Sequence, residues 1–103
     1  MKVYICGNRQ YEHEFYKAEV LLRHQGHIPV NPIKILHALP EEISNSDFTV
    51  IAFELIWISD AVYLLDEWEN DLFAAMELAH AKRMEKEIIM KRTEDNANVV
   101  LCM

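Results

Sequence analysis

Short apolar runs that alternate with helical segments constrain this chain more than any other feature. Four runs are rich in β-branched and aromatic residues and end near turn-forming residues, which is typical of strands. They are Lys2–Cys6, His27–Val30, Ala61–Leu65 and Glu87–Met90. Strands that alternate with helices build a parallel sheet. The sequence therefore predicts an α/β domain whose sheet has four or five parallel strands.

Three segments between these runs are predicted to be helical. From Tyr11 onward, apolar residues recur at helical spacing until Gly26, which supplies a C-terminal stop. The run Phe48–Ile58 follows several potential helix caps in Ser44–Asp47. Its β-branched content equally suits a buried strand, but the alternation of strands and helices favours a helix. The third helix is predicted over Leu72–Met84.

The remaining segments lack a clear period. Ile33–Pro40 is predicted to be a long irregular loop. Pro29 cannot donate a hydrogen bond to a neighbouring strand, so it is expected on an edge strand or at the end of a strand. From about residue 91 the chain becomes polar, and residues 99–103 are apolar again. We expect this ending to dock, for example on a second subunit.

Length and charge limit the possible partners. The chain has 103 residues, 51% of them hydrophobic, and we expect one domain over residues 1–103. A domain of this size buries only about 60% of its unfolded surface, so a partner subunit would help and a homodimer is expected. The net charge of −7 argues against a nucleic-acid polymer or an anionic membrane as partner. A single nucleotide remains possible, because a helix N-terminus binds one phosphate without net positive charge.

The sequence also predicts a cytoplasmic protein. No signal peptide is recognised, and the longest apolar stretch, Phe48–Ile58, contains Glu54 and is too short to cross a bilayer. Cys6 and Cys102 form no metal or redox spacing, so both are expected to be reduced thiols. We expect no cofactor.

Strand order points to a ligand site. In an open sheet of order 2-1-3-4, ligands bind beside the loops after the first and third strands, here Gly7–Gln10 and Asp66–Asp71. The first loop combines a glycine, which lets the backbone approach a ligand, with hydrogen-bond donors. The second surrounds Trp68 with carboxylates, and an exposed indole suits a nucleobase or sugar, although core packing or a dimer contact explains it equally well. The candidate substrate-binding residues are Gly7, Asn8, Arg9, Asp60, Trp68, Asn70, Asp71 and Phe73.

Glu77 is the carboxylate that the pattern singles out. Three of its four neighbours one helical turn away are apolar, so its carboxyl group is expected to be partly desolvated and more reactive. The alternative is an ordinary surface glutamate that pairs with His80 or Lys82.

Several segments together resemble the nucleoside 2-deoxyribosyltransferase-like family, in particular a small branch often found in phage and bacterial genomes. They are Met1–Gly7, Gln25–His27 leading to Asn31–Pro32, Ser59–Leu65, and Trp68–Asn70 leading to Glu77. The resemblance covers roughly residues 1–90. It implies a flavodoxin-like, Rossmann-like three-layer fold, assembly as dimers or larger oligomers, and a small-molecule nucleoside or nucleotide as ligand.

The resemblance also implies an activity, cleavage of the N-glycosidic bond of 2'-deoxynucleosides or their 5'-monophosphates. A glutamate attacks the anomeric carbon, and another base or water resolves the glycosyl-enzyme. Such a carboxylate stabilises an oxocarbenium-like transition state, and the covalent intermediate divides one barrier into two. Glu77 stands at the nucleophile's position. Tyr4 stands where the family's tyrosine hydrogen-bonds that nucleophile, although an ordinary strand tyrosine is the alternative.

The sequence departs from the family in three places. Asp71 and Phe73 replace small residues before the glutamate; the ring obstructs a sugar pocket, and the carboxylate repels a 5'-phosphate. Ala52 replaces an aspartate that acts as general acid, a role typically worth about 10²- to 10⁴-fold in rate. Asp60, Asp66 or Asp71 are candidate substitutes. The alternative function is a catalytically inactive member that binds a nucleotide or a protein.

A metal site is a third hypothesis, from His13 and its neighbours Glu12 and Glu14. A helix cannot point three consecutive side chains in one direction, and the other histidines match no standard ligand spacing. We therefore predict no metal. Acidic residues near a helix N-terminus explain this stretch more simply.

Overall fold

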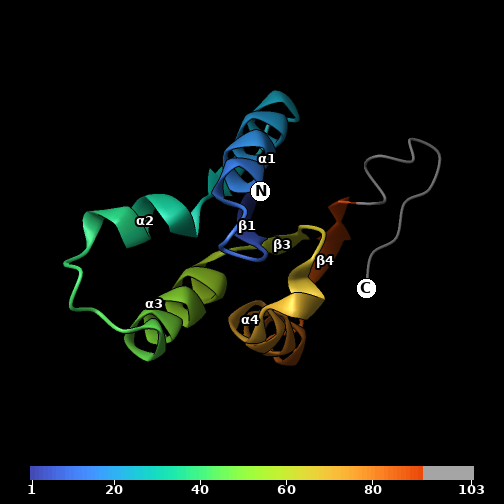
Figure 1. The fold of residues 1–103 in the computed structure, drawn as a ribbon. Helices are drawn as coiled ribbons and strands as arrows, with labels where there is room; N and C mark the ends of the chain where they lie inside the picture. The colour runs from blue at the N-terminus through green and yellow to red at the C-terminus, as the bar shows by residue number, and fades with distance from the viewer. Residues whose placement is uncertain (92–103) are drawn as a thin grey trace.

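The computed structural model describes residues 1–91 and contains a four-stranded parallel sheet of order β2-β1-β3-β4, with helices on both faces (Figure 1). In chain order the elements are β1 (Lys2–Cys6), α1 (Glu12–His24), β2 (Ile28–Val30), α2 (Pro32–Ala38), α3 (Asn45–Ile58), β3 (Ala61–Leu64), the 3-10 helix η1 (Trp68–Asn70), α4 (Leu72–Arg83) and β4 (Glu87–Met90). The chain reverses its winding between β1 and β3. The predicted flavodoxin-like class and strand order are confirmed.

The sheet has two buried faces, because side chains alternate along each strand. On β1, Val3 and Ile5 pack with the buried side chains of α1, whereas Tyr4 and Cys6 pack with those of α3 and α4. Figure 1 shows α1 on one side of the sheet and α3 with α4 on the other. The alternation therefore brings Tyr4 to the same side of the sheet as Glu77.

The ends of α1 and α3 confirm two of the predicted helices. Ser44 and Asp47 form a capping box: the Asp47 amide donates to Ser44 Oγ over 3.0 Å, and the Ser44 amide donates to the Asp47 carboxylate over 3.2 Å. This cap favours helix over strand for the β-branched run that follows. Gly26 lies just beyond α1 at a φ of 84°, a left-handed conformation that glycine adopts without steric cost.

The predicted irregular loop over Ile33–Pro40 is wrong, because α2 forms there. Asn31 caps this helix, with its Oδ1 accepting from the Ile33 amide over 3.0 Å, and Pro32 occupies the first turn, where a missing amide costs nothing. Ile33 is fully buried on the α1 side of the sheet. The neighbouring prediction for Pro29 is confirmed, since β2 is an edge strand.

The described residues end at Lys91. The expectations for the polar segment, for the apolar residues 99–103 and for Cys102 lie outside them. Within residues 1–91, Cys6 is a buried free thiol. None of the helices in this part of the chain is long and apolar enough to span a membrane.

Candidate active site

Glu77 lies on the side of α4 that faces the sheet. It shares this buried stripe with Ala74, Leu78 and Ala81, and only 2% of its surface is exposed. Asp71 is the N-cap of α4, and its Oδ1 accepts from the Phe73 amide over 3.1 Å, which fixes the start of the helix at Leu72. The alternative of a solvated surface glutamate is wrong.

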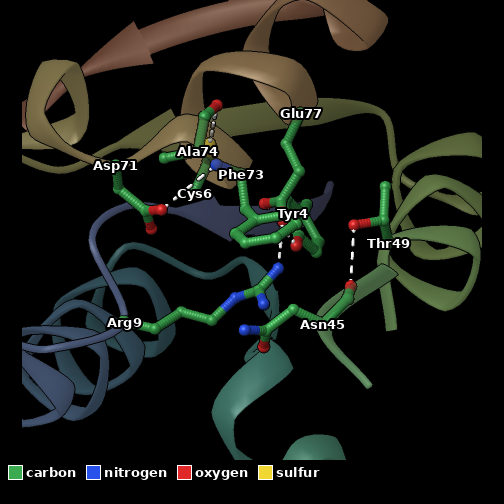
Figure 2. Close-up of polar contacts among 9 residues, drawn as sticks. All are labelled: Tyr4, Cys6, Arg9, Asn45, Thr49, Asp71, Phe73, Ala74 and Glu77. Atoms are coloured by element: carbon green, nitrogen blue, oxygen red, sulfur yellow. Dashed lines mark hydrogen bonds and ion pairs between the residues drawn. The ribbon is translucent and has the colours of Figure 1, made fainter. Parts of the chain in front are cut away.

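Both carboxylate oxygens of Glu77 are engaged by residues from the first strand and its loop. The Tyr4 hydroxyl donates to Oε1 over 2.8 Å, and the Arg9 guanidinium donates to Oε2 over 2.6 Å (Figure 2). Tyr4 is fully buried, and the Arg9 side chain is 13% exposed. A phenol and a guanidinium thus meet one carboxylate at the carboxyl edge of the sheet.

Two aromatic rings hold Arg9 in place. Its guanidinium carbon lies 4.7 Å from the ring centroid of Phe48 and 5.5 Å from that of Phe73. Both distances fall within the range of favourable cation–π contact. The rings come from α3 and α4, so Arg9 connects the loop after β1 to both helices. The sequence marked Arg9 as a substrate-binding residue, but it did not predict this pairing with Glu77.

The environment of Glu77 acts on its acidity in opposite directions. Burial raises the pKa of the Glu77 carboxyl above its ordinary value, and this effect dominates. The positive charge of Arg9 and the hydrogen bond from Tyr4 lower the pKa, because both favour the ionised form, whereas the negative charge of Asp71 raises it further. Arg9 is therefore the main group that opposes the effect of burial on the pKa of this carboxyl.

Two neighbouring groups keep their protons. Burial, followed by the negative charge of Glu77, raises the pKa of the Tyr4 hydroxyl well above its usual value. The same two effects raise the pKa of the Cys6 thiol, which donates to the backbone carbonyl of Ala74 over 3.5 Å. Tyr4 can therefore only donate to Glu77, and Cys6 is a poor nucleophile in this state.

A hollow of about 230 Å³ lies against the outer side of Arg9 and Phe73. Its lining residues are Asn8, Arg9, Gln10, Asn45, Asn70, Asp71 and Phe73. Glu77 is not on its wall, so Arg9 and Phe73 separate the carboxylate from the open space. Sequence reasoning missed Asn45 and Phe48. Their signal was available, because α3 leads into β3 and so its first turn must lie at this same edge.

A larger hollow of about 500 Å³ lies on the other side of Asn8, toward α1. Tyr11, Glu14 and Asp66 are among its lining residues, and none of the groups that contact Glu77 belongs to it. Because chemistry requires reactive groups and not volume alone, we regard the smaller hollow as the candidate site. Asp66 faces the larger hollow, where its carboxylate lies 3.4 Å from Lys91 Nζ.

Three of the predicted loop residues shape the edge of the site. A Cβ at Gly7 would lie 2.8 Å from Leu65 Cβ, so this glycine permits close packing of the two loops. Asn8 Oδ1 accepts from the Gln10 amide over 3.0 Å and closes a turn. The side-chain amide of Asn70 donates to Glu67 over 2.7 Å.

Two other predicted site residues, Trp68 and Asp60, do not line the candidate site. Trp68 was expected to be exposed, but its ring is half-buried against the core on the α3 and α4 side, and its Nε1 is buried without a hydrogen-bond partner in the described chain. Asp60 precedes β3 and so lies at the amino edge, where its carboxylate accepts from the Lys2 amide over 2.8 Å. Ala52 is fully buried in the core.

Within residues 1–91 no group of three or more His, Cys, Asp and Glu side chains is placed to hold a metal ion. The histidines and acids near the start of α1 form pairs instead. His37 Nε2 lies 2.9 Å from Glu12 Oε1, and His13 Nε2 lies 3.6 Å from Glu14 Oε1.

Comparisons with solved structures show two proteins that share this fold. The 2-deoxyribosyltransferase of the psychrotolerant bacterium Bacillus psychrosaccharolyticus superposes with a TM-score of 0.70 at 23% identity, over 87% of this chain and 71% of that enzyme. The CMP N-glycosidase of Clostridium botulinum superposes with a TM-score of 0.63 at 16% identity, over 87% of this chain and 67% of that one. The resemblance noted in the sequence is thus confirmed as a shared fold.

The chain belongs to the family described as a domain of unknown function, DUF4406, which matches residues 1–90. No curated protein matches the sequence.

Proposed function

We propose that the protein cleaves or transfers the N-glycosidic bond of 2'-deoxynucleosides or 2'-deoxynucleotides, with Glu77 as the nucleophile. One observation carries the proposal: a buried carboxylate, contacted by Tyr4 and Arg9, lies behind Arg9 and Phe73, which line a hollow at the reversal point of the sheet. The two similar structures, a deoxyribosyltransferase and a CMP N-glycosidase, support this class of substrate.

The reaction has two steps. A Glu77 oxygen forms a bond to the anomeric carbon while the carbon–nitrogen bond to the base breaks, and the base nitrogen takes the electron pair and a proton. Water or a second base then attacks the same carbon while the bond from Glu77 to that carbon breaks, and the acid that protonated the first base takes up the proton that the attacking group loses. Arg9 maintains the ionised nucleophile, and Tyr4 orients it by donating to one oxygen.

Substrate entry requires the Arg9 contact with Oε2 to open, because Arg9 and Phe73 separate Glu77 from the hollow. Arg9, Asn45 and Phe73 then contact the sugar. Of the three acids considered as substitutes for the aspartate missing at position 52, Asp71 lines this hollow. We therefore assign it to protonation of the leaving base.

The test is incubation with a panel of deoxynucleosides and their 5'-monophosphates, with and without a free acceptor base, followed by chromatography of the bases. We expect release or exchange by the wild type and a loss of about 10³-fold or more in Glu77→Gln and Glu77→Ala. Asp60→Asn, at the opposite edge, is the matched control and keeps full activity. No release from any substrate, or unchanged activity in both Glu77 variants, would refute the proposal.

A second candidate function is binding of a nucleotide or a protein without catalysis. It is favoured because Glu77 has both oxygens occupied and no place on the hollow's wall, and because Ala52 cannot act as an acid. Thermal unfolding with a nucleotide panel discriminates between the two, since a ligand at a hundred times its Kd stabilises by about 2.7 kcal/mol. Stabilisation without base release supports this second function.

A further inference from the structure

The two aromatic rings that contact Arg9 differ in how firmly the fold holds them. Phe48 is fully buried and belongs to the same core cluster as Tyr4. Phe73 is half-buried, lines the hollow of about 230 Å³, and belongs to neither core cluster of the described residues. Phe73 can therefore turn aside without opening the core, whereas Phe48 cannot.

The start of α3 fixes the position of Phe48. Its amide donates to the Ser44 carbonyl over 2.9 Å, inside the turn that the capping box of Ser44 and Asp47 closes. In the same turn the Thr49 hydroxyl donates to the Asn45 carbonyl over 2.9 Å. A fixed backbone and close packing leave a buried ring one position, so Phe48 forms a rigid wall of the site.

Arg9 depends on its neighbours for its position. It reaches from the loop between β1 and α1 toward Glu77 (Figure 2), and within residues 1–91 the hydrogen bond to Glu77 Oε2 is the only one that its guanidinium makes. A long side chain of this kind loses much rotamer freedom when it is fixed. An aromatic face attracts a cation within about 6 Å, most strongly where water is scarce, and the Phe48 ring centroid lies 4.7 Å from the guanidinium carbon. The attraction to Phe48 therefore offsets part of that loss.

We propose that Phe48 is a positioning residue, whose ring keeps the Arg9 guanidinium beside Glu77 when a ligand enters and turns Phe73 aside. Entry opens the hydrogen bond from Arg9 to Glu77 Oε2, and the contact with Phe48 remains. The positive charge of Arg9 then continues to favour the ionised Glu77 carboxyl. The consequence for catalysis rests on the proposed function, whereas the contact between Phe48 and Arg9 does not.

The direction in which the pKa of Glu77 changes separates positioning from packing. The titratable groups around Glu77 are Tyr4 and Cys6 on β1, Arg9 in the loop after it, and Asp71 at the start of α4. Arg9 is the positive group among them, so a weaker hold on Arg9 raises the pKa of Glu77. A mere cavity in place of the ring has the opposite effect, because water that enters it relieves the burial that raises this pKa.

The test is an NMR titration of the Glu77 carboxyl carbon in protein labelled with ¹³C-glutamate, with the signal assigned by its absence in Glu77→Gln. Phe48→Leu removes the ring and should raise the pKa of Glu77. Phe15→Leu, the same change at a ring that is 1% exposed on the α1 side of the sheet, is the matched control and should leave it unchanged. Replacement of Phe48 by 4-fluorophenylalanine keeps the shape of the ring and weakens its attraction for a cation, so it should raise the pKa by a smaller amount.

The rate of base release gives a second measurement. In Phe48→Leu the acidic limb of the pH–rate profile should move to higher pH, and at a fixed pH on that limb the rate should fall about threefold to tenfold. Phe15→Leu should not move the limb. A wild type that releases no base would refute the proposed function, and the titration would still decide the role of Phe48.

Circular dichroism shows whether each variant is folded, and the fluorinated ring decides the question if Phe48→Leu does not fold. An unchanged or lowered pKa of Glu77 in the folded Phe48 variants would overturn the proposal. An equal rise in Phe15→Leu would overturn it as well, because the effect would then follow from a loosened core and not from the contact with Arg9.

Discussion

The two edges of the sheet shift the pKa of an acidic side chain in opposite directions. At the carboxyl edge, Glu77 is 2% exposed, and burial raises the pKa of its carboxyl. At the amino edge, Asp60 is exposed, and the hydrogen bond from the Lys2 amide lowers the pKa of its carboxyl. Asp60 precedes β3, and Glu77 lies on the helix that follows β3. Both were candidate site residues. Position relative to the strand's direction, and not residue type, therefore decides which acid lies at the candidate site.

The largest stability effect is expected at the carboxyl edge. Arg9→Met removes the partner of a buried carboxylate and should lower the free energy of unfolding by about 3 kcal/mol at neutral pH. Folding raises the pKa of the Glu77 carboxyl, so this group stabilises the fold at pH values below its unfolded-state pKa. That stabilisation is lost as the pH rises through the folded-state pKa. Without Arg9 the folded-state pKa is higher still, so the loss continues to a higher pH.

The difference between Arg9→Met and the wild type should therefore shrink toward acidic pH, where Glu77 is protonated in both. Urea unfolding at a series of pH values measures it. Arg23→Met, an exposed arginine of α1, is the control and should change stability little. A pH-independent loss would show that Arg9 acts through packing against the aromatic rings and not through charge.

An intermediate effect is expected for Tyr4→Phe, which keeps the buried ring and removes the hydroxyl. Loss of a hydrogen bond to a charged group should cost about 2 kcal/mol of unfolding free energy. The pKa of Glu77 should rise, so the acidic limb of the pH–rate profile for base release should move to higher pH. Tyr16→Phe, on the exposed surface of α1, serves as the control. If the acidic limb of the profile does not move in Tyr4→Phe, the Tyr4 hydroxyl does not affect the ionisation of Glu77.

The smallest effect is expected at the amino edge. The lowered pKa of Asp60 means that its stabilising contribution is present above its unfolded-state pKa and is lost as pH falls through the folded value. Asp60→Asn should therefore destabilise the protein slightly at neutral pH and not at all in acid. Thermal unfolding at the two pH values measures this change, and an effect as large as that of Arg9→Met would contradict the difference between the edges.

Much of the fold was predictable from local sequence, because strands and caps leave short-range signals. The four apolar runs predicted β1 to β4, and the alternation of strands and helices, together with the potential caps before Phe48, predicted α3. The helix α2 was missed although Asn31 and Pro32 form a cap and first turn of the expected kind. The desolvation of Glu77 was predicted from its apolar neighbours one turn away.

The contacts of the candidate site were less predictable, because they join residues distant in sequence. The pairing of Arg9 with Glu77 depends on where three elements cross, and no local pattern encodes that crossing. Trp68 was misjudged because its sequence neighbours are acidic, whereas its ring packs on the core. Asp60 was misjudged although its place before a strand already assigned it to the amino edge.

The close packing of Gly7 on Leu65 has a practical consequence for redesign. Any larger residue at position 7 would push the two loops apart, and Arg9, only two positions further, would move with them. Attempts to widen the hollow for bulkier ligands should therefore vary Phe73 and leave the glycine unchanged.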